Sequence, residues 1–485
     1  MNLKVITRNV GIALLVDALF MLLSVIVSMA GGNDSALSAL TISFFITFVV
    51  GAFPFIFVRK SPNITLKDGY MIIFLSWLLS FIFGMLPYAL WGGPFTLINA
   101  WFESVSGFTT TGASILENVE ALPNSLLFWR ASTHFIGGLG VVVFLLLIIP
   151  TSSPVRLRLT NMELSSISRG DYRSRANKTV SIFAWVYLGI CAIAFFSYWA
   201  AGMSAFDAIC HAFSVCATGG FSSRNLSIGF FQSPLISWLT IVFMFLASIH
   251  FGIIFVTIAT RSLRPLNNPV LKMYALFLVL GALLSSFSLK VHNVDTGWAD
   301  AFLAGTFQVV SYASTTGFAI ADNSSWPMVP CFVLILASMV CGCAGSTTCG
   351  LKMDRLIVLW KAIKSQIRRA LHPSSVNDVK LGKKALHDDE VYPMILYIAM
   401  YTFILAISAM LCLMLGGDQS GHAITGSIAS LGNVGPSIGS IGSLGNYNAE
   451  PAAVKFVFTM DMFLGRVEIY PVLAVFISIF SPRQQ

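Results

Sequence analysis

Charged residues are scarce in this chain, and their scarcity excludes a soluble fold. Only 10% of its 485 residues are charged, 56% are hydrophobic, and the mean hydropathy is +0.81. A soluble domain cannot cover its surface with so few charges. The apolar runs are mostly about 20 to 30 residues long, which suits helices crossing a hydrocarbon core, and they lack the alternation of β-barrel strands. We therefore expect an all-α integral membrane protein.

Motifs for catalysis and cofactor binding are also missing. The chain contains no H-E-x-x-H, G-x-G-x-x-G or phosphate-binding loop, so we expect neither an enzyme nor an organic cofactor. The eight cysteines lie in or beside apolar segments, which indicates free thiols. The segment that holds Cys341, Cys343 and Cys349 contains no His or carboxylate to complete a metal site. The net charge is +8, but the basic residues are confined to certain loops, which argues against nucleic-acid binding.

About ten segments are long and apolar enough to span a membrane. The first is long and contains Asp17, so we expect a spanning helix rather than a cleaved signal. The predicted spans lie near residues 9–30, 36–58, 69–91, 125–150, 179–201, 234–260, 273–290, 328–363 (interrupted), 391–416 and 452–481.

The basic residues predict how these spans are oriented. If alternate loops are assigned to the cytoplasm, all but five of the 29 Lys and Arg residues fall on that side. We therefore predict a multi-pass protein with both termini in the cytoplasm. The five exceptions are Arg130, Arg224, Lys290, Lys455 and Arg466.

The predicted outer side is rich in carboxylates. Such a bias would concentrate cations at an outer mouth, or it simply reflects the avoidance of Lys and Arg in outer loops. The acidic residues in question are Asp34, Glu103, Glu117, Glu120, Asp207, Asp295, Asp300, Asp322, Asp418 and Glu450.

One short half-polar motif recurs four times between spans. The stretches "FESVSGFTTTG" and "FQVVSYASTTG" share F-x-x-V-S-x-x-x-T-T-G, "CHAFSVCATGG" keeps the Ser and the T-x-G ending, and "TGSIASLGNVG" keeps the length and the final glycine. The final glycines, Gly112, Gly220, Gly317 and Gly435, are 108, 97 and 118 residues apart. The repeating unit is therefore a span, a short helix, a glycine turn and a second span, following two initial helices.

The chemistry of this unit suits a cation. Non-helical backbone at membrane depth must be buried in protein or line a water-filled cavity. Four such turns facing one axis would surround it with carbonyl oxygens, which replace the hydration shell of a cation, while the short helices point their negative ends inward. We predict a pseudo-fourfold fold around one central pore, divided into residues 1–60 (two helices), 61–158, 159–264, 265–371 and 372–485 (repeats 1 to 4).

These motifs resemble the Trk/Ktr/HKT superfamily of potassium transporters, most closely its bacterial TrkH branch, over the whole chain. In that family four glycines line a potassium filter, and members with serine at the first position admit sodium, whereas this chain has Gly112. The resemblance implies potassium uptake across the bacterial inner membrane. Because each motif is looser than the filter of tetrameric potassium channels, we expect moderate selectivity over sodium, with rubidium and some sodium accepted. The implied filter residues are Thr110, Thr111, Gly112, Thr218, Gly219, Gly220, Thr315, Thr316, Gly317, Asn433, Val434 and Gly435.

The resemblance also implies partners. These are a homodimer and a cytosolic TrkA-like ring that binds nucleotides and acts on the gate. The basic stretch 359–390 is a plausible surface for that ring or for anionic lipid.

The eighth span is interrupted by "CGCAGSTTCGLK", which cannot remain a regular helix. The family resemblance implies a gating loop there, formed by Gly345, Ser346, Thr347, Thr348 and Gly350; a kink that only aids packing is the alternative.

Arg466 lies deep in the last span and needs a partner, for which we consider Asp461, Glu468 or the pore itself. By resemblance it is an electrostatic barrier to cations. We assign no role to His134 or His250. A proton- or sodium-coupled symporter remains the alternative to channel-like uptake.

Overall fold

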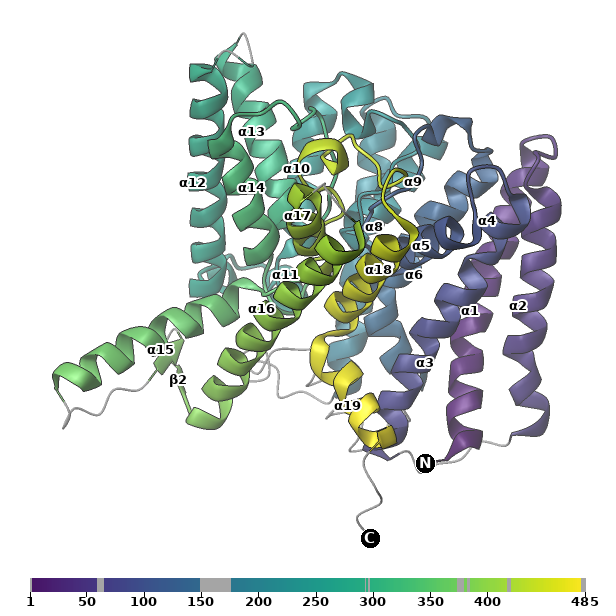
Figure 1. Cartoon of the computed structure of the whole chain (residues 1–485), viewed down its shortest axis with the longest axis horizontal. Coiled ribbons are helices and arrows are strands. Elements are labelled where there is room, and N and C mark those ends of the chain that lie inside the picture. Colours follow the sequence, from purple (N-terminus) through teal and green to yellow (C-terminus); the bar gives the residue numbers. More distant parts are fainter. Residues whose placement is uncertain are drawn as a thin grey trace.

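The computed structural model is a bundle of helices (Figure 1). It describes residues 2–58, 65–148, 176–292, 294, 297–372, 379–381, 384–416 and 420–480. Within these ranges the only sheet is a two-stranded hairpin, so the all-α prediction is confirmed. Six helical stretches are long and apolar enough to cross a membrane, and a seventh is a pair bent by 100°. The protein is therefore a multi-pass membrane protein. Among the residues named above, Asp295 and Asp418 lie outside the described ranges.

The two predicted N-terminal helices are present, and they form a close antiparallel pair. They are α1 (Leu3–Ala30) and α2 (Leu37–Phe57). A Cβ on Gly11 of α1 would lie 2.6 Å from the carbonyl oxygen of Gly51, and one on Gly51 would lie 3.1 Å from Leu14. Small residues therefore allow the two backbones to approach closely, which is a usual basis of helix packing in membranes.

The rest of the chain forms four similar units. The first comprises α3 (Leu66–Gly84), α4 (Leu86–Trp91), α5 (Leu97–Phe108), η1 (Val119–Ala121) and α6 (Asn124–Ile148). The second comprises α8 (Ala176–Ala200), α9 (Ala205–Ala217), η2 (Ser227–Phe231), α10 (Pro234–Ser248) and α11 (Phe251–Thr260).

The third unit follows the turn η3 (Arg264–Leu266) and comprises α12 (Pro269–Val291), α13 (Trp298–Ala313), α14 (Met328–Val340) and α15 (Met353–Leu371). The strands β1 (Val379–Leu381) and β2 (Lys384–Leu386) pair antiparallel and lead to the fourth unit. It comprises α16 (Asp388–Gly416), α17 (Ser420–Leu431), η4 (Gly439–Ile441), α18 (Ala452–Val467) and α19 (Ile469–Phe480).

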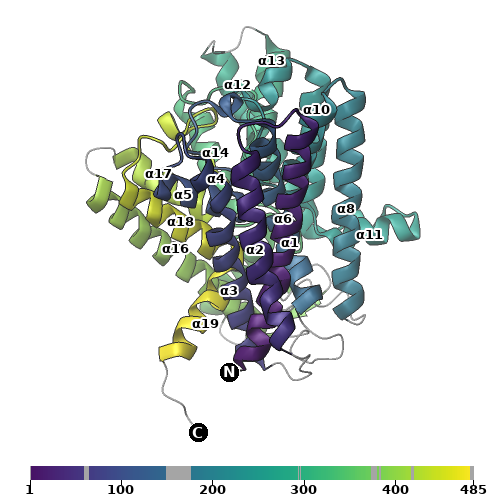
Figure 2. The same ribbon diagram turned by 90° about the vertical axis from the view of Figure 1, so that its right-hand side faces the viewer.

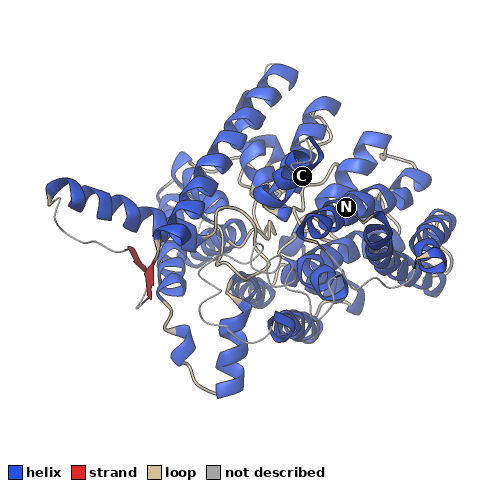
Figure 3. Cartoon of the chain, turned by 90° about the horizontal axis from the view of Figure 1, so that it is seen from below, coloured by secondary structure: helices blue, strands red, loops and turns tan. Residues whose placement is uncertain are grey.

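The four short helices α5, α9, α13 and α17, here called the pore helices, lie in the half of the molecule opposite the start of α1 and the end of α19 (Figures 1 and 2). Local sequence starts two of them, because the side chains of Thr96 and Ser204 accept hydrogen bonds from the amides of Asn99 and Asp207. Seen along the bundle, the helices surround a central group of loops (Figure 3).

Within the described residues, the second span of a unit is unbroken only in the first unit. In the second unit α10 and α11 meet at 100°, so the prediction of one continuous span over 234–260 is wrong. In the third unit the chain is non-helical from Cys341 to Lys352, a stretch here called the break segment, which confirms the predicted interruption. In the fourth, Glu468 separates α18 from α19 with a φ of 64°, so the span predicted over 452–481 is also broken.

Candidate ion-conduction site

The loops that follow the pore helices have the same backbone conformation. In each loop the final glycine has a positive φ, between 76° and 88°, and so does the residue two positions before it, between 52° and 54°. The residues in this second position are Thr110, Thr218, Thr315 and Asn433. A β-branched threonine is rarely found in the left-handed region. The surrounding structure must therefore hold this strained conformation, which is typical of functional sites.

The same hydrogen bond closes each pore helix. In every copy the amide just before the glycine donates to the carbonyl five residues earlier, at 2.9 Å: Thr111 to Ser106, Gly219 to Ser214, Thr316 to Ser311, and Val434 to Ala429. The stretches 110–112, 218–220, 315–317 and 433–435, here called glycine loops 1 to 4, are thus structural copies even where their side chains differ.

The glycine loops form a closed ring. A Cβ on Gly112 would collide with the carbonyl oxygen of Gly219 in loop 2, and one on Gly220 with that of Thr316 in loop 3. In the same way Gly317 faces the carbonyl oxygen of Val434, and Gly435 faces that of Thr111. Each glycine therefore packs against the residue before the next glycine, in the order 1, 2, 3, 4 and back to 1. Any side chain at these positions would meet rigid backbone.

All four glycines line one cavity of about 210 Å³ on the side of the ring away from the termini. Its wall also carries Glu117, Arg130 and Arg224, so charges of both signs face this mouth. Several of the predicted outer carboxylates are paired rather than available to cations: Glu103 lies 2.8 Å from Arg130, and Asp207 lies 2.8 Å from Arg224. The mouth is therefore less negative than the sequence indicates.

The ion pair between Arg224 and Asp207 lies at the mouth, outside the spanning helices. Hydrogen bonding to Asp207 raises the pKa of the Arg224 guanidinium; partial burial opposes this, and the charges of Asp207 and Glu120 reinforce it. Arg224 therefore stays charged at any physiological pH.

Loop 4 is tied into the ring by side chains that the other loops lack. The Nδ2 of Asn433 donates to the hydroxyl of Thr111 at 2.9 Å and to the carbonyl of Met462 at 2.8 Å. The hydroxyl of Tyr447 donates to the carbonyl of Gly435 at 2.8 Å. The replacement of threonine by Asn433 thus links loop 4 directly to loop 1.

Each of the first three pore helices supports its loop with a polar side chain nine residues before the glycine. Glu103 accepts hydrogen bonds from Ser114 and from the amide of Ile115, at 3.0 and 3.1 Å. A ring nitrogen of His211 lies 2.9 Å from the hydroxyl of Ser222. Gln308 donates to the carbonyl of Ala321 at 2.9 Å, whereas the fourth helix has Gly426 there, packed against Phe458.

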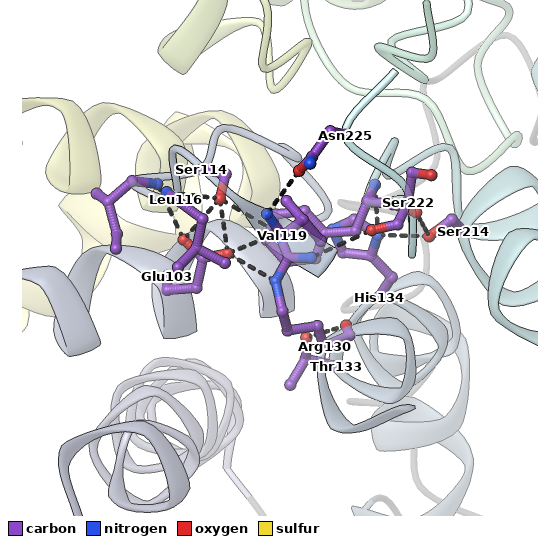
Figure 4. A network of polar contacts seen from close by, with 12 residues as sticks. Glu103, Ser114, Leu116, Val119, Arg130, Thr133, His134, Ser214, Ser222 and Asn225 are labelled. Carbon is purple, nitrogen blue, oxygen red and sulfur yellow. Dashed lines mark hydrogen bonds and ion pairs between the residues drawn. The ribbon is translucent and has the colours of Figure 1, made fainter. Parts of the chain in front are cut away.

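His134, to which the sequence assigns no role, lies behind loop 2. Its ring stacks on Phe221 at 4.1 Å, its Nδ1 lies 3.1 Å from the hydroxyl of Ser214, and a Cβ on Gly219 would collide with it (Figure 4). A histidine inside the helix after the first loop gives no sequence signal for this contact, because its partners belong to the second unit.

The break segment lies beside the ring. The amide of Cys349 faces the hydroxyl of Thr315 in loop 3 at 3.4 Å, and the hydroxyls of Ser346 and Thr348 are 2.7 Å apart. Gly345 and Gly350 have positive φ values of 78° and 73°. The predicted gate residues are therefore together in one irregular loop next to the predicted filter.

The bend in the second unit exists because its backbone bonds to the break segment. The carbonyl of Ser248 accepts from the amide of Cys343 at 3.0 Å, and the amide of Phe251 donates to the carbonyl of Gly345 at 2.9 Å. His250 begins α11 by accepting from the amide of Gly252 at 3.0 Å, and its ring lies against Gly345. The break segment thus rests on the α10–α11 corner.

Arg466 contacts the break segment, not a carboxylate. Its guanidinium donates to the carbonyl of Thr347 and to that of Gly137 in α6, both at 2.8 Å, and lies 3.2 Å from the sulfur of Cys349. Of the carboxylates predicted as partners, Glu468 pairs with Arg355 at 2.9 Å, and Asp461 accepts from Ser408. An ion pair with either is therefore wrong, and the two Nη atoms of the buried guanidinium donate to backbone carbonyls instead.

Comparison with known proteins places these features in one family. The family model described as "TrkH: Cation transport protein" matches residues 36–484. The chain is 30% identical over 484 residues to the Trk system potassium uptake protein TrkH of Escherichia coli, and 31% identical over 485 residues to that of Halomonas elongata, covering 99% of both chains in each case. The crystal structure of the potassium transporter TrkH from Vibrio parahaemolyticus matches with a TM-score of 0.89 at 28% identity, over 99% of this chain and 100% of that one. The chain therefore belongs to the TrkH family of cation transport proteins.

Proposed function

We propose that this chain is the ion-conducting subunit of a potassium-uptake system. Its relatives in Escherichia coli and Halomonas elongata are named potassium uptake proteins. It moves potassium, with rubidium and some sodium also accepted, through a channel-like filter, and it catalyses no chemical reaction and holds no organic cofactor. The observation that carries the proposal is the closed ring of four glycine loops with a common backbone.

Potassium is bound in the ring by backbone carbonyls and threonine hydroxyls. The proposed ion-binding residues are Thr110, Thr111, Gly112, Thr218, Gly219, Gly220, Thr315, Thr316, Gly317, Asn433, Val434 and Gly435. The carbonyl of Gly435 is already an acceptor for Tyr447, so the four sides of the ring offer unequal oxygens. This inequality supports moderate rather than extreme preference for potassium over sodium.

The break segment is the gate, formed by Gly345, Ser346, Thr347, Thr348 and Gly350 together with Arg466. The guanidinium of Arg466 repels cations and holds Thr347 in place at 2.8 Å. Opening then requires that this hydrogen bond break and that the segment move away from the ring.

The gate is controlled by a cytosolic TrkA-like ring that binds nucleotides. The relatives belong to a named "Trk system", which supports partner subunits. We place the protein in the bacterial inner membrane as a homodimer with both termini cytoplasmic, in contact with membrane lipid. The chain is organised as residues 1–60 and the repeats 61–158, 159–264, 265–371 and 372–485. The helix α15 and the hairpin β1–β2 extend from the bundle at the end where α1 begins, and offer a docking surface (Figure 1).

A coupled symporter is the second candidate function. Asp461, buried in α18 and hydrogen-bonded by Ser408, is a carboxyl within a membrane helix close to Arg466, and such groups carry protons in coupled transporters. Coupling through Asp461 would make potassium flux depend on a proton gradient.

The test is flux through purified protein in proteoliposomes. We expect rubidium uptake driven by membrane potential alone, inhibited more strongly by potassium than by sodium, and with a reversal potential that does not change with the proton gradient. A reversal potential that follows the proton gradient would favour symport. No cation flux, with or without a cytosolic partner, would refute both.

A further inference from the structure

A buried ion pair joins the pore helix of the first unit to the first two glycine loops. Glu103 of α5 is fully buried and Arg130 of α6 is only 2% exposed. The Nε and Nη2 atoms of Arg130 both lie 2.8 Å from Oε1 of Glu103. A guanidinium and a carboxylate of this kind hold each other in a fixed orientation, because both are planar.

Each partner also contacts the backbone just beyond a glycine. Glu103 accepts from the amide of Ile115 at 3.1 Å and from the hydroxyl of Ser114 at 3.0 Å. Arg130 donates through Nη2 to the hydroxyl of Ser114 at 3.2 Å and through Nη1 to the carbonyl of Ser222 at 3.3 Å. Ser114 is two residues after the glycine of loop 1, and Ser222 is two residues after that of loop 2.

The guanidinium therefore crosses from one glycine loop to the next. Figure 4 shows it between Glu103 and Ser114 on one side and Ser222 on the other. Its central carbon lies 4.0 Å from the ring centroid of Phe221, the residue that follows Gly220. The Arg130–Glu103 ion pair therefore contacts the chain just beyond both Gly112 and Gly220.

The other pore helices have no such bridge at the same position. His211 and Gln308 reach the chain beyond their own glycines, and Gly426 has no side chain. Loops 1 and 2 are thus held at a set separation by a charged pair, whereas Asn433 links loop 4 to loop 1 through a neutral hydrogen bond.

We propose that Arg130 and Glu103 are positioning residues that set the separation of glycine loops 1 and 2 and thereby the preference for potassium over sodium. The inference rests on the proposed function of the ring as a potassium filter. Selectivity depends on the number and position of the oxygens around the ion, so a change in loop separation alters the discrimination between cations of different size. The carboxylate also neutralises an arginine at the cavity mouth, so that the pair adds no net charge where cations enter.

The decisive variant is Arg130→Lys, which keeps the charge but loses the planar fork. An ammonium can pair with Glu103, yet it cannot also donate to both Ser114 and the carbonyl of Ser222 in the same geometry. We expect the potassium over sodium preference to fall about tenfold, the change equivalent to about 1.4 kcal/mol and typical of one lost hydrogen bond to a charged group.

The matched control is Arg8→Lys. Arg8 also lies over an aromatic ring, 5.0 Å from the centroid of Phe55, and donates to a carbonyl, that of Val58 at 2.7 Å, but it belongs to α1 near the chain start. Arg8→Lys should keep the wild-type ion preference. A purely structural loss at Arg130 would lower the yield of folded protein without changing the ratio between ions.

The measurement is rubidium uptake by the full chain in proteoliposomes, with potassium and sodium as competitors and flux normalised to monodisperse protein. If Arg130→Lys does not fold, Ser114→Ala removes one hydroxyl shared by both partners and should shift the ratio in the same direction by a smaller factor. Unchanged ratios in the variants that fold would overturn this inference while leaving the filter proposal intact. A wild-type protein that moves no rubidium would overturn the proposed function and this inference with it.

Discussion

Replacing Gly112 by serine tests the ring at its first position. Gly112 has a φ of 78°, and a Cβ there would collide with the carbonyl oxygen of Gly219. Left-handed backbone costs a non-glycine residue about 1–2 kcal/mol, and the collision must in addition displace loop 2. If the displaced carbonyl loses an interaction with the ion of about 1–2 kcal/mol, the potassium over sodium preference falls about 5- to 30-fold.

Gly92→Ser provides a control with a similar positive φ but without a collision. Gly92 has a φ of 80°, and no atom lies within 4 Å of the position that a Cβ would occupy. This variant should lose some stability but keep the wild-type ratio of potassium to sodium inhibition of rubidium uptake in proteoliposomes. The reasoning is refuted if Gly112→Ser keeps the wild-type ratio, or if Gly92→Ser lowers it equally.

The remaining predictions concern the break segment and the loop between α1 and α2. Arg466→Gln removes a positive charge and the 2.8 Å hydrogen bond to Thr347, so rubidium flux should rise several-fold; a lower flux with intact protein would contradict the proposed gate. His250→Leu removes the hydrogen-bond acceptor at the start of α11, which costs about 1 kcal/mol, and it removes the ring that supports Gly345. Gating should therefore change in the same flux assay. His250→Asn keeps an acceptor and should stay closer to wild type. Burial raises the pKa of Asp34, but hydrogen bonds from Ser28, Ser125 and Ala36 outweigh it and hold the pKa below its usual value. The ionised carboxylate therefore stabilises the fold above about pH 4, and this contribution is lost as the pH falls further, so the melting temperature of Asp34→Asn should lie below wild type at neutral pH and converge with it in acid.

The repeating unit could be predicted from sequence because its signals are local. Hydropathy marks the spans, and a glycine at the end of each short helix marks the turn. The same pattern predicted the break segment, since Gly345 and Gly350 with three hydroxyl residues between them cannot stay helical in a span.

The 100° corner at His250 could not be predicted in the same way. Residues 234–260 are mostly apolar, and the hydrogen bonds that open the helix come from Cys343 and Gly345, which belong to another unit. The partners of Arg466 were missed for a related reason. Every residue has a backbone carbonyl, so the sequence does not indicate that the carbonyl of Thr347 accepts this hydrogen bond. Sequence shows charges, so it directed attention to Asp461 and Glu468, which have other partners.

The order in which the glycines meet their neighbours has a consequence for how the chain can evolve. The four glycine loops are encoded separately in one chain, so a substitution alters one loop at a time. In a homotetramer the same substitution would appear in all four subunits. The residues one and two places before the glycine have diverged to Val434 and Asn433 without loss of the shared backbone shape. A substitution of a glycine, by contrast, would disturb two loops, because the added Cβ would collide with the backbone of the neighbouring loop. The four glycines are therefore constrained jointly, while the residues beside them are free to make each side of the ion path chemically distinct.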